Sequence, residues 1–132
     1  LQREALLALA RTRGMRAVGL HWAPNMVLPE HHGAPVFDDI LAMIERKSPE
    51  VFALQVRALL GRPDARAVFA SIACPTLIGC GRHDAWSPLA RHQQMQRLRP
   101  ASRLVVIEDS GHMSPMEQPA AVTRALVEWL AH

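Results

Sequence analysis

The sequence predicts an α/β protein in which a helical segment, residues 1–72, precedes a strand–helix–strand–helix segment, residues 73–132. The first segment has apolar residues at helical spacing and no strand signal. Two short apolar runs, residues 76–80 and 104–107, are typical of strands buried on both faces of a parallel sheet. A helical pattern lies between them, so strand, helix and strand form a βαβ unit with a right-handed crossover.

The helical segment divides into several predicted helices. The first begins with apolar residues at 6–10, is interrupted at Gly14 and continues to residue 22, before prolines break the chain. Residues 30–35 read as a loop, and a second helix is expected over 37–44. Ser48 and Pro49 are typical of a helix N-terminus, and that third helix ends at Gly61. One more short helix is expected over 62–72.

In the second segment, the strand over 76–80 leads to a helix that we expect Ser87 and Pro88 to cap. The strand over 104–107 comes next, and Pro119 begins a final helix with one apolar side. The parallel strands of such a unit end at the same edge of the sheet, where α/β proteins bind their ligands. Residues just beyond the strands are therefore candidate functional residues.

Composition restricts the classes of function. The chain has 132 residues and a net charge of +3, and no basic stripe with interleaved aromatic residues points to a nucleic-acid partner. No apolar run approaches the roughly 20 residues that span a membrane, so we expect no membrane partner. Cys74 and Cys80 lie too far apart along a strand for a disulfide. We expect free, buried thiols and a cytoplasmic location.

Asp84 and His112 follow the two predicted strands. Neighbouring strands lie about 4.8 Å apart, so these side chains can meet. A carboxylate beside an imidazole accepts the Nδ1–H and stabilises the imidazolium that forms when Nε2 takes a proton from a nucleophile. For each residue alone a structural role is the alternative, such as Asp84 capping a turn ahead of Ser87. Their pairing at adjacent strand ends favours the functional interpretation.

Two stretches resemble α/β-hydrolases. "CPTLIGCGRHDAWSP" (74–88) is similar to the family's acid strand and loop, and "RLVVIEDSGHMSPMEQPAAVTRALVEWL" (103–130) to its last strand, Gly-His motif and closing helix after E-x-P. The order of acid before histidine also matches. Residues 1–72 are more loosely similar to the helical cap that these enzymes insert before the acid strand. The resemblance implies the C-terminal portion of an α/β-hydrolase fold, with Asp84 as acid and His112 as general base.

The chain departs from the family pattern because it has no G-x-S-x-G nucleophile motif. We therefore expect part of a hydrolase whose nucleophile, Ser or Asp, lies upstream, and which is inactive alone. Esterase- or lactonase-type ester hydrolysis is the expected reaction. The resemblance also implies C–C bond hydrolases, epoxide hydrolases, dehalogenases and haloperoxidase-like members, and the choice among them stays open.

The same resemblance implies a pocket for a small, partly apolar substrate, lined by Trp86, Met113 and, in the cap, Trp22 and Met26. Ordinary packing is the alternative for each of them. The mechanism needs no organic cofactor and no metal. An apolar strand edge without a neighbour would pair with another chain, so the 132-residue species by itself is expected to dimerise, swap strands or aggregate.

Two other classes of function compete with hydrolysis. The chain could be a non-catalytic helical interaction module on an α/β scaffold, whose function would be independent of Asp84 and His112. Metal binding by His31, His32 and His83 is the other class. It is disfavoured because the adjacent His31–His32 pair is poor for chelation and has no carboxylate at ligand spacing.

Overall fold

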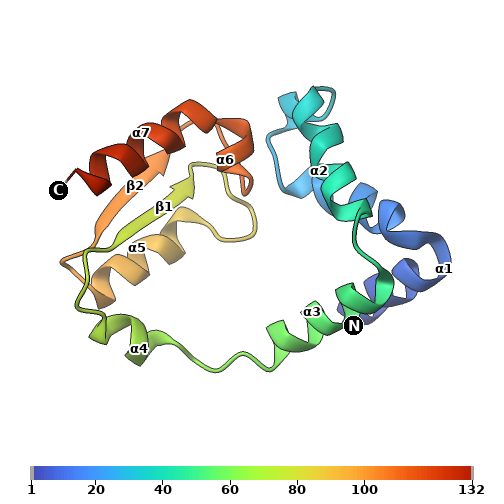
Figure 1. The fold of residues 1–132 in the computed structure, drawn as a ribbon, viewed down its shortest axis with the longest axis horizontal. Helices are drawn as coiled ribbons and strands as arrows, with labels where there is room; N and C mark the ends of the chain where they lie inside the picture. The colour runs from blue at the N-terminus through green and yellow to red at the C-terminus, as the bar shows by residue number, and fades with distance from the viewer. Residues whose placement is uncertain (1, 132) are drawn as a thin grey trace. The chain divides into compact units, whose positions relative to one another are not determined.

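The computed structural model describes residues 2–131, and their contacts divide the chain into two compact units (Figure 1). The first unit comprises the residues up to Pro24 together with Glu30–Pro63. The second comprises the short segment Asn25–Pro29 and the chain from Asp64 onward. The segment Asn25–Pro29 thus packs with residues that are far from it in sequence.

The first unit is helical, as predicted. Its helices are α1 (Gln2–Trp22), which is broken at Gly14 (φ 79°), α2 (Pro35–Glu45) and α3 (Pro49–Leu60). Two short 3₁₀ turns, η1 (Ala23–Asn25) and η2 (Pro29–His31), connect α1 to α2. The buried side chains lie on the facing sides of these helices and include Val18, Ile40, Leu41, Ile44 and Phe52.

The start of α3 shows how a local sequence pattern fixes a helix end. Ser48 is extended, and its Oγ accepts a hydrogen bond from the Val51 N–H at 3.3 Å. Pro49 occupies the first turn, where a backbone N–H would lack a helical acceptor. The last helical residue is Leu60, and Gly61 forms the C-cap, as the sequence indicated.

The second unit contains a two-stranded parallel sheet and four helices in the described part of the chain. In order they are α4 (Arg66–Ser71), β1 (Leu77–Gly81), α5 (Leu89–Leu98), β2 (Arg103–Ile107), α6 (Ser114–Glu117) and α7 (Pro119–Leu130). The strands pair in register from Leu77 opposite Arg103 to Gly81 opposite Ile107. The predicted βαβ unit is therefore present, and both strands end at the same edge.

The register decides which helix covers which face of the sheet. Ile78 and Cys80 are buried on one face, and α5 packs against both strands. The opposite face carries Leu77, Gly79, Val105 and Ile107, which line an apolar hollow of about 250 Å³ together with residues of α6 and α7. Figure 1 shows α5 and α7 on opposite sides of the strand pair.

Several local expectations need correction. Ser87 does not cap α5: the helix begins at Leu89 with Pro88 at the N-cap position and no side-chain capping hydrogen bond. The Ser87 N–H donates to the Asp84 carboxylate in the preceding turn. Cys80 is buried as expected, but Cys74 is exposed. The short helix α6 was not predicted, although Ser114 and Pro115 repeat the Ser-Pro pattern of α3.

The division into a cap (1–72) and a core (73–132) stays a prediction. By contacts, α4 belongs with α5 in the second unit.

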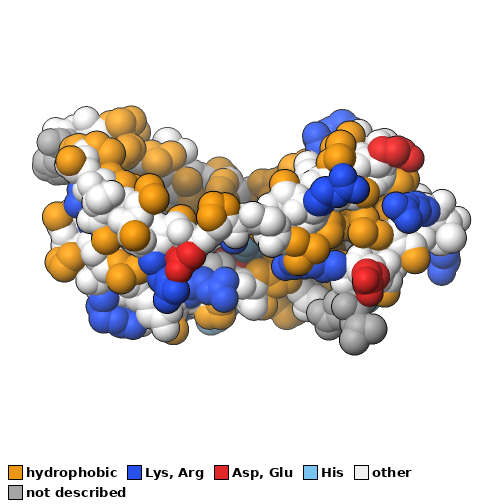
Figure 2. Space-filling view, turned by 90° about the horizontal axis from the view of Figure 1, so that it is seen from below, with side chains coloured by type: hydrophobic (Ala, Val, Ile, Leu, Met, Phe, Trp, Pro, Cys, Tyr) orange, Lys and Arg blue, Asp and Glu red, His pale blue; other side chains and the backbone are white. Residues whose placement is uncertain are grey.

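Within residues 2–131, no helix is both long enough and apolar enough to cross a membrane. On the face shown in Figure 2, Lys and Arg side chains stand in several separate groups among apolar side chains.

Candidate active site

The two loops that follow β1 and β2 lie side by side because the strands are parallel neighbours. The Arg82 N–H donates to the Ile107 carbonyl at 2.9 Å, and the His83 N–H donates to the Ser110 carbonyl at 3.0 Å. Ser110 is fully buried, and its Oγ donates back to the Ile107 carbonyl at 3.0 Å. Backbone hydrogen bonds thus hold the two loops together before any side chain of the site is considered.

Gly81 allows this close approach. A Cβ at this position would lie 2.0 Å from the Gly111 carbonyl oxygen and 2.7 Å from that of Ser110. Such distances are far below van der Waals contact, so any side chain here would push the second loop away. The last residue of β1 is therefore fitted to the peptide that immediately precedes His112.

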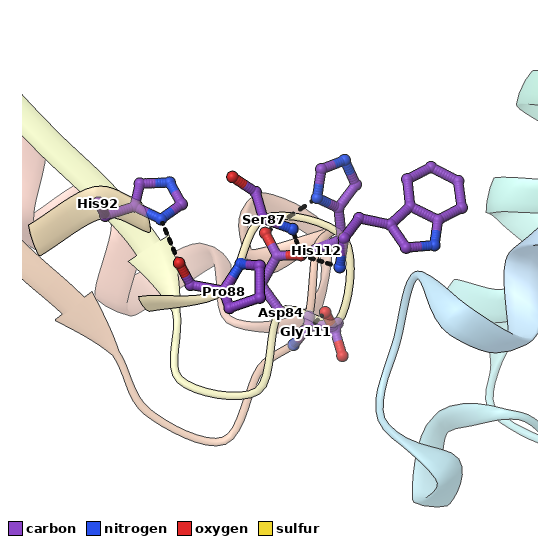
Figure 3. Close-up of polar contacts among 8 residues, drawn as sticks. Asp84, Ser87, Pro88, His92, Gly111 and His112 are labelled. Atoms are coloured by element: carbon purple, nitrogen blue, oxygen red, sulfur yellow. Dashed lines mark hydrogen bonds and ion pairs between the residues drawn. The ribbon is translucent and has the colours of Figure 1, made fainter. Parts of the chain in front are cut away.

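Asp84 uses its two carboxylate oxygens for two purposes (Figure 3). Oδ1 accepts the backbone N–H groups of Trp86 and Ser87, both at 2.8 Å. Oδ2 lies 2.9 Å from Nδ1 of His112. The turn-capping role that we considered as an alternative is present, and it leaves the other oxygen to contact the imidazole.

Burial and hydrogen bonding act on the acidity of Asp84 in opposite directions. Burial raises the pKa of this carboxyl, but the Ser87 N–H, His112 and the Trp86 N–H together lower it more. The net effect is a pKa below the ordinary value of 3.8, so the carboxylate is ionised at neutral pH. The Asp84 side chain is 6% exposed, whereas that of His112 is 35% exposed.

This geometry sets what His112 can do. An ionised carboxylate only accepts hydrogen bonds, so Nδ1 must carry the hydrogen in the Asp84–His112 contact. The neutral ring then presents an unprotonated Nε2, which is able to accept a proton from another group. An imidazole held in this tautomer by a buried carboxylate has the arrangement of a general base.

Two other predicted site residues lie beside this pair. The Trp86 ring centroid is 5.0 Å from that of His112, with the planes tilted by 44°. Met113 follows His112 directly, and its N–H donates to the Met26 carbonyl at 3.0 Å. Trp22 belongs to the first unit, where its ring makes an edge contact with Phe52 at 5.2 Å.

A model of the alpha/beta hydrolase family matches residues 2–125 of the chain. The chain belongs to this family. The family and the α/β fold class predicted from the sequence motifs are thereby confirmed, and the fold of this family member matches solved hydrolase structures.

One such structure is a thermophilic esterase from Thermogutta terrifontis, with 34% identity and a TM-score of 0.89, covering 98% of this chain and 48% of that chain. The enol-lactonase from Burkholderia xenovorans LB400 is 24% identical, with a TM-score of 0.87. The match covers 98% of this chain and 50% of that chain, and it shows that the two folds are alike. A protein named as the carbamate hydrolase RutD, from Pseudomonas savastanoi pv. phaseolicola, is 34% identical over 67 residues, which are 51% of this chain and 26% of that protein. This hydrolase-family chain spans about half the length of the solved structures it matches.

Sequence reasoning missed one carboxylate near the site. Glu117, at the end of α6, accepts a hydrogen bond from the Gly111 N–H at 2.8 Å and another from the Leu28 N–H at 2.9 Å. The only sequence signal was its place in the E-x-P motif, which says nothing about its contacts. The described residues contain no group of three or more His, Cys, Asp or Glu side chains that could hold a metal ion.

Proposed function

We propose that this chain supplies the acid, Asp84, and the general base, His112, of a catalytic triad that hydrolyses carboxylic esters. The nucleophile, a serine in this proposal, would come from a segment outside these 132 residues. The observation that carries the proposal is the 2.9 Å contact between Asp84 Oδ2 and His112 Nδ1, at the carboxyl ends of two adjacent parallel strands.

In the proposed reaction, Nε2 of His112 removes the proton from the serine hydroxyl as its oxygen attacks the ester carbonyl. Asp84 keeps the ring in the required tautomer and stabilises the imidazolium. The imidazolium then gives its proton to the departing alkoxide, which leaves as the alcohol. Water deprotonated by the same nitrogen hydrolyses the acyl-enzyme, so the acid is released and the serine is restored.

Two relatives at 34% identity support acyl chemistry, one an esterase and the other a protein named as a carbamate hydrolase. Esters and carbamates both react through attack at a carbonyl carbon, for which the same acid–base pair serves. The tilted Trp86 ring beside His112 supports a small substrate with an apolar part. Met113 and Trp22 stay proposed substrate contacts.

The test uses the protein that carries this chain together with its nucleophile segment, and 4-nitrophenyl acetate as the ester. Asp84→Asn leaves an isosteric side chain but favours the wrong histidine tautomer, so kcat should fall by about 10⁴-fold. The matched control is Asp109→Asn, because Asp109 is exposed in the histidine loop and its φ of 49° suits asparagine. Equal activity of Asp84→Asn and the control would refute the proposed role.

A further inference from the structure

The carboxylate of Glu117 joins two backbone segments that are distant in sequence. Its Oε2 accepts the Gly111 N–H at 2.8 Å, and its Oε1 accepts the Leu28 N–H at 2.9 Å. Both hydrogen bonds are partly buried. Each oxygen serves one backbone donor, so a carboxylate suits this position and a group carrying its own N–H does not.

A third hydrogen bond completes the connection. The Met113 N–H donates to the Met26 carbonyl at 3.0 Å, so backbone groups immediately before and after His112 are both anchored. Met26 and Val27 are only 7% and 6% exposed, so the segment that makes these hydrogen bonds is itself buried. A Cβ on Gly111 would lie 2.9 Å from the Met26 carbonyl oxygen and 3.3 Å from the Val27 Cα, so the two backbones are in close contact.

These contacts leave His112 at the centre of a supported turn. On one side, Gly81 lies in close contact with the backbone of Ser110 and Gly111, and the His83 N–H donates to the Ser110 carbonyl. On the other side, the Glu117 carboxylate accepts the Gly111 N–H, and the Met26 carbonyl accepts the Met113 N–H. The imidazole must keep Nδ1 on Asp84, and this backbone support restricts the positions that its Cα can take.

We propose that Glu117 is a positioning residue: it fixes the conformation of the loop that carries His112 by binding that loop to residues 26–28. Its effect on catalysis rests on the proposed function, whereas its effect on the loop does not. Since a misplacement of about 1 Å costs roughly 100-fold in rate, loss of this support should lower kcat by about that factor. KM should change little, because Glu117 acts on the base through the backbone.

The experiment compares Glu117→Gln and Glu117→Ala with the control Glu128→Gln in the protein that carries this chain. Glu128 lies in α7 and forms an exposed ion pair with Arg103, so its change removes a carboxylate without touching the loop. Glutamine keeps one acceptor oxygen and places an N–H near the other backbone donor. Alanine removes both acceptors. If Glu117→Ala fails to fold, the glutamine variant still provides the comparison.

Two readouts separate this inference from the proposed function. The first is amide hydrogen exchange at Gly111 and Leu28, which should become at least 10-fold faster in both Glu117 variants and stay unchanged in the control. The second is the split between kcat and KM for 4-nitrophenyl acetate. Unchanged exchange at both amides would overturn the inference, as would a loss confined to KM. A wild-type protein without esterase activity would refute the proposed function, and the exchange rates would still decide the role of Glu117.

Discussion

Replacing Gly81 by alanine tests the fit between β1 and the histidine loop. The added Cβ would stand 2.0 Å from the Gly111 carbonyl oxygen, whereas real Cβ contacts are essentially never under 3.0 Å. The loop must therefore move by about 1 Å, because all three of the nearest atoms belong to the backbone, which cannot simply rotate away. Overpacking of this kind costs about 1–3 kcal/mol of stability, and a shift of about 1 Å at His112 costs roughly 100-fold in kcat.

The assay measures kcat for 4-nitrophenyl acetate and the free energy of unfolding in urea. The matched control is Gly79→Ala, two residues earlier on the same strand and face, where no described atom lies within 4 Å of the new Cβ. We expect the control to keep its activity. If Gly81→Ala equals the control in both activity and stability, the claim that this glycine sets the position of the histidine loop is wrong.

Two further predictions concern stability. Because Asp84 has a folded-state pKa below 3.8, its ionised form stabilises the fold fully above that pH, and this contribution is lost as the pH falls through the lower folded value. The stability difference between wild type and Asp84→Asn, measured by urea unfolding, should therefore shrink below pH 3.8, and a difference that grew there would contradict the lowered pKa. Ser48→Ala removes the acceptor of the Val51 N–H at the start of α3 and should cost about 1 kcal/mol, which thermal unfolding would detect; an unchanged melting temperature would show that the cap contributes nothing.

Local chemistry explains which helix ends could be predicted. Ser48 and Pro49 begin α3 as expected because the capping hydrogen bond needs only residues within one turn. The same Ser-Pro pair misled at Ser87, because the Asp84 carboxylate takes the Ser87 N–H and helix α5 begins later. Here a neighbouring local turn, closed by an acceptor three residues earlier in the chain, displaced the expected helix start.

The site was predictable to the extent that topology determines it. A βαβ unit brings the ends of its strands together, so Asp84 and His112 could be paired from their positions after two apolar runs. The support of the histidine loop could not be predicted in this way. Glu117 reaches Leu28, 89 residues earlier in the chain, and no periodicity or spacing encodes that contact.

The central claim is that Asp84 and His112 activate a serine nucleophile. Intact-mass spectrometry after treatment with a fluorophosphonate, which reacts with activated serines, tests it most directly. In the protein that carries this chain, we predict one adduct on the wild type and almost none on His112→Ala, with the Asp109→Asn control labelled like the wild type. Labelling of His112→Ala at the wild-type rate, or no adduct on the wild type, would contradict the claim.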